Sequence, residues 1–266
     1  MEVVALASGS KGNCWYVEVG GKHVLIDAGI SMKQINIRLL QYVGVDLDDI
    51  EFIFITHRHS DHVQSLNAIM NKYKHIKFLA PKIVFDEYST EYRKFIPQNV
   101  RIDLTENYNL QGKAFDVSNQ RINHDVACFA YKFVDNVTKE SFLFLSDNGG
   151  IKKNTIRQWM KGCTYYAIES NHDLTKQIFS ERHEGLKRRV LGYYGHTHNA
   201  EAYDTMINVI TGETKGVMFH HLSDECNSEE LAKATHDELT KIWGNVTALK
   251  EIDIKYARQG EGVRLV

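Results

Sequence analysis

Thr56-His57-Arg58-His59-Ser60-Asp61-His62 directly follows residues 51–55, which are almost entirely apolar, and these two segments decide the fold. In an extended segment, residues two apart point to the same side, so His57 and His59 can hold one metal ion together. The turn into the following helix directs Asp61 and His62 toward a second ion nearby. The alternative is a solvated loop with chance histidines, but site ligands often gather where a buried strand ends. The pattern therefore predicts half of a two-metal site.

The composition is that of an ordinary globular chain: 266 residues, 43% hydrophobic and 25% charged. Lys and Arg total 32 against 34 for Asp and Glu, so the net charge of −2 provides no global attraction to nucleic acid, and any polyanion must be met locally. The four cysteines are far apart, which predicts reduced, structural thiols. Without an N-terminal targeting segment or a membrane-length apolar run, we expect a cytoplasmic protein with no membrane association.

The hydrophobic patterning predicts alternating strands and helices in one continuous domain, residues 1–266. We expect strands over 3–7, 15–19, 22–26, 51–56, 114–117, 127–134, 141–145, 164–168 and 216–222. We expect helices over 32–42, 63–73, 83–95, 151–160 and 200–209, and from 227 or 228 to about 243. Two β-rich halves with helices outside them indicate an α/β fold, a four-layered αββα sandwich.

The segment His57-x-His59-x-Asp61-His62 resembles the signature of the metallo-β-lactamase fold, an αββα sandwich whose ligands lie at strand ends along one edge. Four further motifs follow in the order of that family: Leu25-Ile26-Asp27-Ala28-Gly29, Asn123-His124-Asp125, Ser146-Asp147-Asn148-Gly149-Gly150 and Phe219-His220-His221-Leu222-Ser223. The resemblance implies His124 as the third ligand beside His57 and His59. It implies that Asp27 lies behind the ligands and orients the histidines.

The same resemblance implies that Asp147 bridges both ions and that His221 is the last ligand, beside Asp61 and His62. Two alternatives stay open from the residues themselves. Because side chains alternate along a strand, only one of His220 and His221 can face the site, and His220 remains the other candidate. Asp147 could instead cap a helix that begins near Ile151. β-Lactamases of this fold usually carry Cys in place of Asp147, so antibiotic hydrolysis is disfavoured.

A closer resemblance, over roughly residues 1–235, is to the YycJ/WalJ branch of bacterial and phage proteins, which is associated with 5′-to-3′ exonuclease activity on DNA. The motifs that carry it are Ala7-Ser8-Gly9-Ser10-Lys11-Gly12-Asn13, Glu169-Ser170-Asn171-His172-Asp173, Gly195-His196-Thr197-His198-Asn199 and His221-Leu222-Ser223. His198 departs from the branch, which commonly has a small hydroxyl residue there. Related nucleases pair an acidic residue with a later His to assist the leaving group, and Glu169 and His196 occupy those places.

The resemblance and the ligand set together predict phosphodiester hydrolysis by a hydroxide held between two divalent ions, Zn²⁺ or Mn²⁺. We expect Asp61, Glu169 and His196 to act in catalysis. The polar residues that we expect to contact the substrate are Ser8, Ser10, Lys11, Asn13, Asn171 and Asn199. Two basic groups, Lys152-Lys153-Arg157-Lys161 and Lys187-Arg188-Arg189, could track a nucleic-acid backbone or could be solvated faces. The pairs Tyr165-Tyr166 and Tyr193-Tyr194 could stack bases or pack in the fold.

Three classes of function fit these features. The first is a metal-dependent nuclease, most simply a DNA exonuclease. The second is a small-molecule phosphodiesterase acting on cyclic nucleotides, which the near-neutral charge favours. The third is a non-catalytic binding module that keeps its metals for folding. The expected partner is therefore nucleic acid, DNA above all, or a nucleotide, and a homodimer is allowed by the sequence without being indicated by it.

Overall fold

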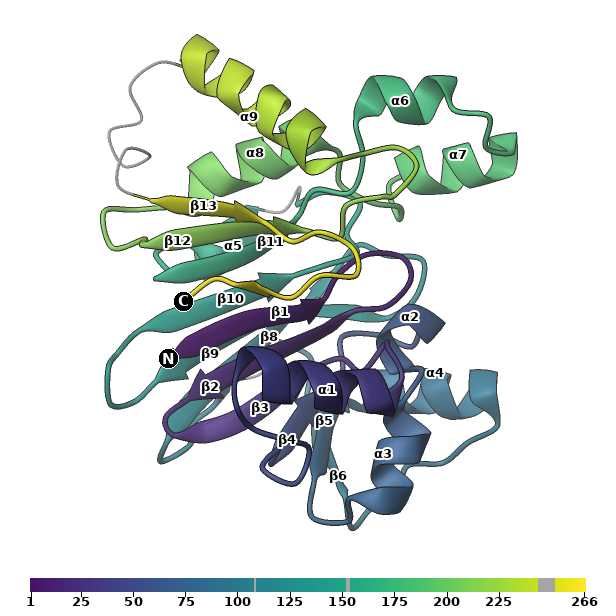
Figure 1. The fold of residues 1–266 in the computed structure, drawn as a ribbon, viewed down its shortest axis with the longest axis vertical. Helices are drawn as coiled ribbons and strands as arrows, with labels where there is room; N and C mark the ends of the chain where they lie inside the picture. Colours follow the sequence, from purple (N-terminus) through teal and green to yellow (C-terminus); the bar gives the residue numbers. More distant parts are fainter. Residues whose placement is uncertain (108, 152–153, 244–251) are drawn as a thin grey trace.

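The computed structural model describes residues 1–107, 109–151, 154–243 and 252–266, and two sheets stack at its centre (Figure 1). The first sheet has seven strands in the order β14-β1-β2-β3-β4-β5-β6, and the second has seven in the order β13-β12-β11-β10-β9-β8-β7, all within the described residues. The strands of the first sheet are β1 (Glu2–Ala7), β2 (Cys14–Val19), β3 (Lys22–Ile26), β4 (Phe52–Phe54), β5 (Lys77–Pro81), β6 (Arg101–Leu104) and β14 (Val263–Arg264). Those of the second are β7 (Asn109–Leu110), β8 (Phe115–Ile122), β9 (Cys128–Asp135), β10 (Ser141–Leu145), β11 (Tyr165–Glu169), β12 (Gly216–His220) and β13 (Asp253–Tyr256).

Helices cover the outer face of each sheet, which confirms the αββα sandwich (Figure 1). Beside the first sheet lie α1 (Met32–Tyr42), α2 (Ser60–Val63), α3 (Leu66–Lys72) and α4 (Lys82–Tyr92). Beside the second lie α5 (Asn154–Met160), α8 (Asn199–Val209) and α9 (Glu229–Trp243). Two further helices, α6 (Leu174–Phe179) and α7 (Glu184–Leu191), form a hairpin that extends away from the sandwich. Among the described residues, no helix combines the length and the apolar character needed to cross a bilayer.

Large aromatic side chains fill the space between the sheets. The Trp15 ring of β2 packs on the Phe144 ring of β10 with centroids 5.3 Å apart, and Phe54 of β4 meets Phe133 of β9 at 5.0 Å. All four side chains are fully buried. Edge-to-face contacts of this kind add to the burial of 150–250 Å² per ring, so they hold the sheets in a fixed relation. The ends of the strands are therefore fixed relative to one another.

The strand directions bring the predicted motifs to one edge of the sandwich. In the first sheet β3, β4 and β5 run parallel to one another, and in the second β10, β11 and β12 do so. Parallel strands end on the same side of their sheet, where ligands of open α/β folds gather. Asp27 follows β3, His57 comes shortly after β4, Asp147 follows β10, and His221 follows β12. The polar motifs thus meet at the carboxyl ends of these four strands.

Most predicted elements are present, but several boundaries differ. The helix expected over 63–73 begins only at Leu66, as α3, because the backbone N–H of Ser65 donates to the carbonyl oxygen of Ala28 at 2.9 Å and so separates α3 from α2. The strand expected over 114–117 runs from Phe115 to Ile122, and the helix expected over 151–160 begins at Asn154, with 152–153 outside the described residues. Strands β5, β6, β7, β13 and β14 and the α6–α7 hairpin were not expected.

Candidate metal centre and active site

Three histidines from both sheets form the first cluster. His57 and His59 come from the loop between β4 and α2, whereas His124 follows β8. The Nδ1 atom of His59 lies 3.0 Å from Nε2 of His57 and 3.2 Å from Nε2 of His124. Two ligands of a tetrahedral zinc ion at 2.0–2.1 Å would lie about 3.3 Å apart. Burial lowers the pKa of His57 well below its usual value and that of His59 to about 4, so both rings are neutral, as metal ligands must be.

Asp61, His62 and His221 form the second cluster. The helix α2 begins at Ser60 and carries Asp61 and His62 in its first turn, while His221 follows β12. The Oδ2 atom of Asp61 lies 3.6 Å from Nε2 of His62 and 3.9 Å from Nε2 of His221. Nε2 of His221 is buried and has no hydrogen-bond partner among the described residues. Such an orphaned nitrogen, facing carboxylates, is what a metal ligand looks like without its ion.

The Asp147 carboxylate lies between the two clusters. Its Oδ2 atom is 3.1 Å from Nε2 of His62, and its Oδ1 atom is 3.7 Å from Nε2 of His221. His57, His62 and Asp147 each offer one ligand atom, and these three atoms lie within 4.8 Å of one another. The same limit holds within the first cluster and within the second cluster. Asp147 does not cap α5, which begins at Asn154, so the capping alternative is wrong. A carboxylate in this place can contact ions in both clusters.

The donor set fits divalent ions. Imidazole with carboxylate ligands suits zinc and manganese alike. Burial lowers the pKa of His221, but the nearby carboxylates of Asp147, Asp61 and Glu169 raise it to about 10. The carboxylates therefore attract positive charge to the point where the orphaned nitrogen lies, and a metal cation would supply that charge.

Two aspartates lie behind the histidines. Nδ1 of His62 donates to Oδ2 of Asp27 at 2.7 Å, and Asp27 also accepts from the backbone N–H and the hydroxyl of Thr56, both at 2.8 Å. This arrangement leaves Nε2 of His62 to face the cluster, as expected for Asp27. Asp125, which the sequence analysis did not single out, has Oδ1 3.3 Å from Nε2 of His59. Its place beside His124 in the motif was the signal that could have found it.

Three of these residues have left-handed backbone conformations. The φ angles are 61° for Asp27, 52° for Asp147 and 58° for His221. A non-glycine residue in this region costs of order 1–3 kcal/mol and persists only where the surrounding structure holds it. All three lie within two residues of a strand end, so the strained turns redirect these side chains into the site.

Glu169, at the end of β11, contacts two histidines. Its Oε1 atom accepts from Nδ1 of His196 and from Nδ1 of His221, both at 2.8 Å. The structure therefore brings together the expected Glu169–His196 pair and adds His221, which the sequence analysis did not connect to Glu169. Although burial opposes ionisation, the adjacent His196 and the hydrogen bonds from both rings hold the pKa of Glu169 below its usual range. The carboxylate is ionised and fixes both rings.

His221, not His220, faces the clusters. Nε2 of His220 lies 2.9 Å from the carbonyl oxygen of Leu145, to which it donates. The His220 ring packs against Trp15 and Phe144, with centroids 5.0 and 5.1 Å away. His220 is thus part of the core between the sheets, and that alternative for the last ligand is set aside.

The residues expected to contact substrate lie in three kinds of place: the pocket wall, the solvent-exposed surface and the interior. Ser10 and Asn171 line the pocket over the clusters. Lys11 extends into solvent, 78% exposed, and its Nζ lies 2.5 Å from a carboxylate oxygen of Asp224. For these three the prediction remains open.

Ser8, Asn13 and Asn199 are buried and bonded within the protein. The Ser8 hydroxyl accepts from the backbone N–H of His221 at 2.8 Å. The Asn13 side-chain oxygen accepts from the backbone of Gly9 at 2.9 Å, and Asn199 accepts from Ser170 Oγ at 2.8 Å. These groups have partners inside the fold, and their contact with substrate stays a prediction.

Of the basic and aromatic runs, only part reaches the site. Lys152 and Lys153 lie outside the described residues, and Arg157 of α5 pairs with Asp204 at 2.8 Å. Tyr165 and Tyr166 are buried in the fold. The Tyr193 and Tyr194 rings are partly exposed and meet edge to face at 4.9 Å. From the second basic run, Arg189 lines the pocket.

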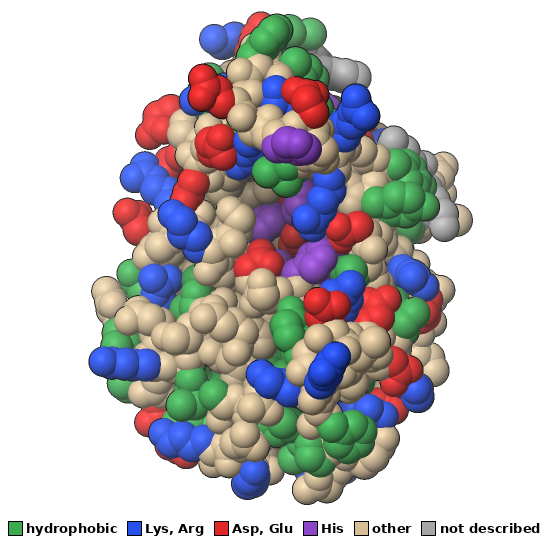
Figure 2. Space-filling model, turned by 90° about the vertical axis from the view of Figure 1, so that its right-hand side faces the viewer, with side chains coloured by type: hydrophobic (Ala, Val, Ile, Leu, Met, Phe, Trp, Pro, Cys, Tyr) green, Lys and Arg blue, Asp and Glu red, His purple; other side chains and the backbone are tan. Residues whose placement is uncertain are grey.

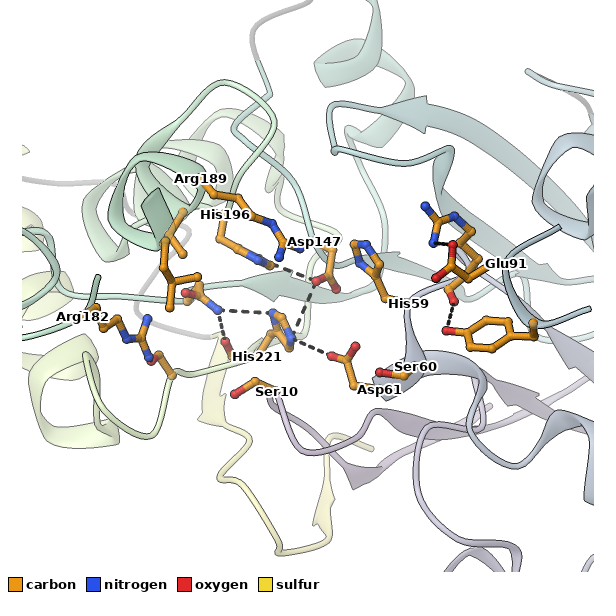
Figure 3. A pocket seen from close by; sticks show the side chains of 16 residues that line it. Ser10, His59, Ser60, Asp61, Glu91, Asp147, Arg182, Arg189, His196 and His221 are labelled. Carbon is orange, nitrogen blue, oxygen red and sulfur yellow. Dashed lines mark hydrogen bonds and ion pairs between the residues drawn. The ribbon is translucent and has the colours of Figure 1, made fainter. Parts of the chain in front are cut away.

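The clusters open into a pocket of about 450 Å³ (Figures 2 and 3). Figure 2 shows histidine side chains at the bottom of a hollow, with acidic and basic side chains beside them. The lining residues are Ser10, Arg58, His59, Ser60, Asp61, Glu91, Tyr92, Asp147, Asn171, Arg182, Leu186, Arg189, Val190, His196, His221 and Ser223. Arg58 and Arg182 were not expected there. The pocket is open and polar, so a charged substrate can reach the clusters.

Comparison with known proteins gives consistent similarities. A family model described as the metallo-beta-lactamase superfamily matches residues 7–117. The chain is 31% identical over 241 residues to exodeoxyribonuclease WalJ of Streptococcus pneumoniae, covering 86% of this chain and 84% of that protein. It is 31% identical over 244 residues to exodeoxyribonuclease YycJ of Bacillus anthracis, covering 90% and 89%. Among solved structures, the metallo-beta-lactamase fold protein YhfI of Bacillus subtilis has a TM-score of 0.69 at 12% identity, covering 99% and 98% of the two chains.

Proposed function

The chain belongs to the metallo-beta-lactamase superfamily, in the family of the WalJ and YycJ proteins, and from this premise we propose that it is a metal-dependent DNA exonuclease. The superfamily fold implies divalent metal ions, and the described residues offer a His and Asp site for them. The observation that carries the proposal is the Asp147 carboxylate between two ligand clusters, with the Glu169–His196 pair beside it. The shared carboxylate and the Glu169–His196 pair suit phosphodiester hydrolysis. The choice of DNA as the substrate rests on the relatives, which are named exodeoxyribonucleases.

We assign the ligands by cluster. The proposed ligands of one ion are His57, His59 and His124, those of the other are Asp61, His62 and His221, and Asp147 is shared. Two Zn²⁺ or Mn²⁺ ions would lower the pKa of a water molecule and neutralise charge on the phosphoryl oxygens. The protein's own contribution is to fix the ligand atoms, since buried histidines and carboxylates held by neighbours do not have to reorganise.

His196 is the group that can move a proton. Its Nδ1 is bonded to the ionised Glu169 carboxylate, so the opposite ring nitrogen, Nε2, is left to the pocket that this side chain lines. A proton on Nε2 can pass to the leaving oxygen of the sugar, whose expulsion as an alkoxide would be slow. Glu169 keeps the ring in this orientation. Asp61, which is only partly buried, stands at the mouth of the second cluster.

The test compares metal-loaded wild type with Asp61→Ala. The substrates are labelled duplex DNA, single-stranded DNA, RNA and cyclic mononucleotides, in parallel. Wild type should shorten DNA, and the variant should keep less than roughly 1% of that activity because one ligand is gone. Asp86→Ala is the matched control, since Asp86 is an exposed aspartate of α4 that pairs with Lys82 and does not line the pocket. Circular dichroism checks that both variants fold.

The results separate the three classes of function. Hydrolysis of cyclic nucleotides without cleavage of DNA would replace the nuclease proposal with a small-molecule phosphodiesterase. Bound metal without turnover of any substrate would indicate the binding module. Full activity of Asp61→Ala at matched metal content would refute the proposed ligand set. A change in mass from monomer to dimer in solution would test the homodimer separately.

A further inference from the structure

The helical hairpin beside the site forms one wall of the pocket. It comprises α6, α7 and the loop between them, and it enters after β11 and leaves before α8. Arg182 of the loop and Leu186, Arg189 and Val190 of α7 line the pocket. In Figure 3 the Arg182 and Arg189 side chains lie on the same side of the clusters as His196, while Glu91 lies on the opposite side. The hairpin therefore faces the part of the site where the leaving group departs.

Arg182 is held in place by three groups. Its Nε donates to Glu225 at 2.7 Å, Nη1 donates to Gln177 at 3.1 Å, and Nη2 donates to Ser223 at 3.0 Å. The side chain is only 16% exposed, which is low for an arginine at a pocket wall. A guanidinium has five N–H donors, and these contacts use three. A fixed guanidinium with donors to spare is preorganised for an anion.

Arg189 is held relative to the first ligand cluster. Its Nε lies 2.8 Å from Oδ2 of Asp125, whose Oδ1 lies 3.3 Å from Nε2 of His59. The Arg189 side chain is 52% exposed, so its terminal nitrogens can meet a ligand. Asp125 is a positioning residue here, because one carboxylate sets both the ligand ring and the arginine. The distance from the metal cluster to this positive charge is thereby fixed.

The two walls differ in what their arginines offer to a phosphate. On the opposite wall, Arg58 lies between Glu91, 3.2 Å from Nη1, and Glu87, 3.6 Å from Nε, so two carboxylates offset its one charge. On the hairpin wall, each arginine has one carboxylate partner, and neither of these carboxylates lines the pocket. A polyanionic strand bound at the clusters therefore meets guanidinium N–H groups of the hairpin that face the pocket without an acidic neighbour in the lining. A substrate with a single phosphate would occupy the clusters and leave these N–H groups without a phosphate.

We propose that Arg182 and Arg189 bind phosphates next to the scissile one, on the side of the leaving product. This inference rests on the proposed nuclease function and deepens it: the substrate is a strand with several phosphates, and the hairpin distinguishes it from a lone phosphodiester. The contacts are to the backbone, so they carry no base preference.

The test measures two substrates with three variants. Arg182→Gln and Arg189→Gln remove the two charges, and Arg188→Gln is the matched control, since Arg188 is an exposed neighbour on α7 that does not line the pocket. The substrates are a labelled 20-nucleotide DNA and bis(p-nitrophenyl) phosphate, which has one phosphodiester. We expect kcat/KM on DNA to fall roughly tenfold in each pocket variant, mainly through KM, and hydrolysis of the small diester to stay within about twofold of wild type.

A binding measurement supports the kinetics. In an Asp61→Ala background, fluorescence anisotropy with the same DNA should show that each pocket variant lowers the slope of log Kd against log salt by about one, while Arg188→Gln lowers it less. Unchanged DNA cleavage in both variants would overturn the inference and leave the nuclease proposal standing, as would equal losses on both substrates. Wild type that hydrolyses neither substrate would refute the proposed function itself, and this inference with it.

Discussion

Replacing Asp27 with Asn should weaken metal binding at the second cluster without moving the backbone. Asp27 accepts three hydrogen bonds, from the N–H and hydroxyl of Thr56 and from Nδ1 of His62. An asparagine offers one acceptor oxygen and an NH₂ group. Either a Thr56 or His62 donor would then face the asparagine NH₂ group, or His62 would accept at Nδ1 and carry its proton on Nε2. A protonated Nε2 cannot bind a metal. Asn tolerates the φ of 61° at this position, so the turn itself is retained.

The magnitude follows from the position of Asp27 behind a ligand. Loss of a group that orients a metal-binding histidine typically costs 10–100-fold in metal affinity or activity, which is about 1.4–2.8 kcal/mol. The loss should fall mainly on the ion at Asp61, His62 and His221, because Asp27 bonds His62 directly, whereas it reaches His57 of the first cluster only through the Thr56 hydroxyl. One of two equivalents of metal should therefore become weak.

The assay is a metal titration by calorimetry, with metal content after dialysis measured by elemental analysis. Asp135→Asn is the control: Asp135 is also buried and accepts three backbone N–H bonds, from Gly20, Val137 and Thr138 at 2.7–2.9 Å. It lies at the far end of β9, whose beginning contacts the site through Thr56. The control should lose stability but keep both metals. Two metals bound with wild-type affinity by Asp27→Asn would refute the reasoning, as would an equal loss in both variants.

Three further outcomes are expected. Gly29→Ala should unfold the site and abolish metal binding, since a Cβ there would lie 1.6 Å from the carbonyl oxygen of Asp61; elemental analysis and a thermal melt check this. Glu169→Gln should lower kcat more than it changes KM, because His196 loses its charged partner. Steady-state kinetics at saturating metal check this, and a change in KM alone would contradict it. Burial lowers the pKa of His236 to about 4, against about 6.5 in an unfolded chain, so its contribution to stability is complete above pH 6.5 and declines as the pH falls toward 4. Urea unfolding should show wild type losing about 2 kcal/mol more than His236→Gln between pH 7 and pH 5, and equal losses would show that His236 does not titrate in this way.

The sequence predicted those parts of the fold that have a local signal. The hairpin around Gly20 and Gly21 is present as β2 and β3, and the helix over 32–42 is α1. In both, the pattern of apolar residues or the turn chemistry acts within a few residues. Strand β5 and the α6–α7 hairpin have no such signal: β5 is short and ends in Pro81, and the hairpin helices are short and largely polar, so their position depends on packing against distant segments.

For the site, motif spacing predicted which side chains would gather, but not the contacts behind them. His57 and His59 are two residues apart, so their sharing of one cluster follows from strand geometry. The contact of Glu169 with His221 joins residues 52 apart in the chain and depends on β11 lying beside β12. Arg182 reaches the pocket because of the path of the hairpin, which no local pattern indicates. The assignment of each residue's role in catalysis stays a prediction, as does the organisation of residues 1–266 as one domain.

The division of ligands between the two sheets has a consequence for how the protein persists in a cell. His57 and Asp61 follow a strand of the first sheet, whereas His124, Asp147 and His221 follow strands of the second. A bound cation would therefore act as a removable cross-link between the two halves of the sandwich. Free energy of metal binding then becomes free energy of folding. Under a chelator or during metal starvation, the protein would unfold more often and be degraded faster, so its abundance would follow metal supply as well as its rate of synthesis.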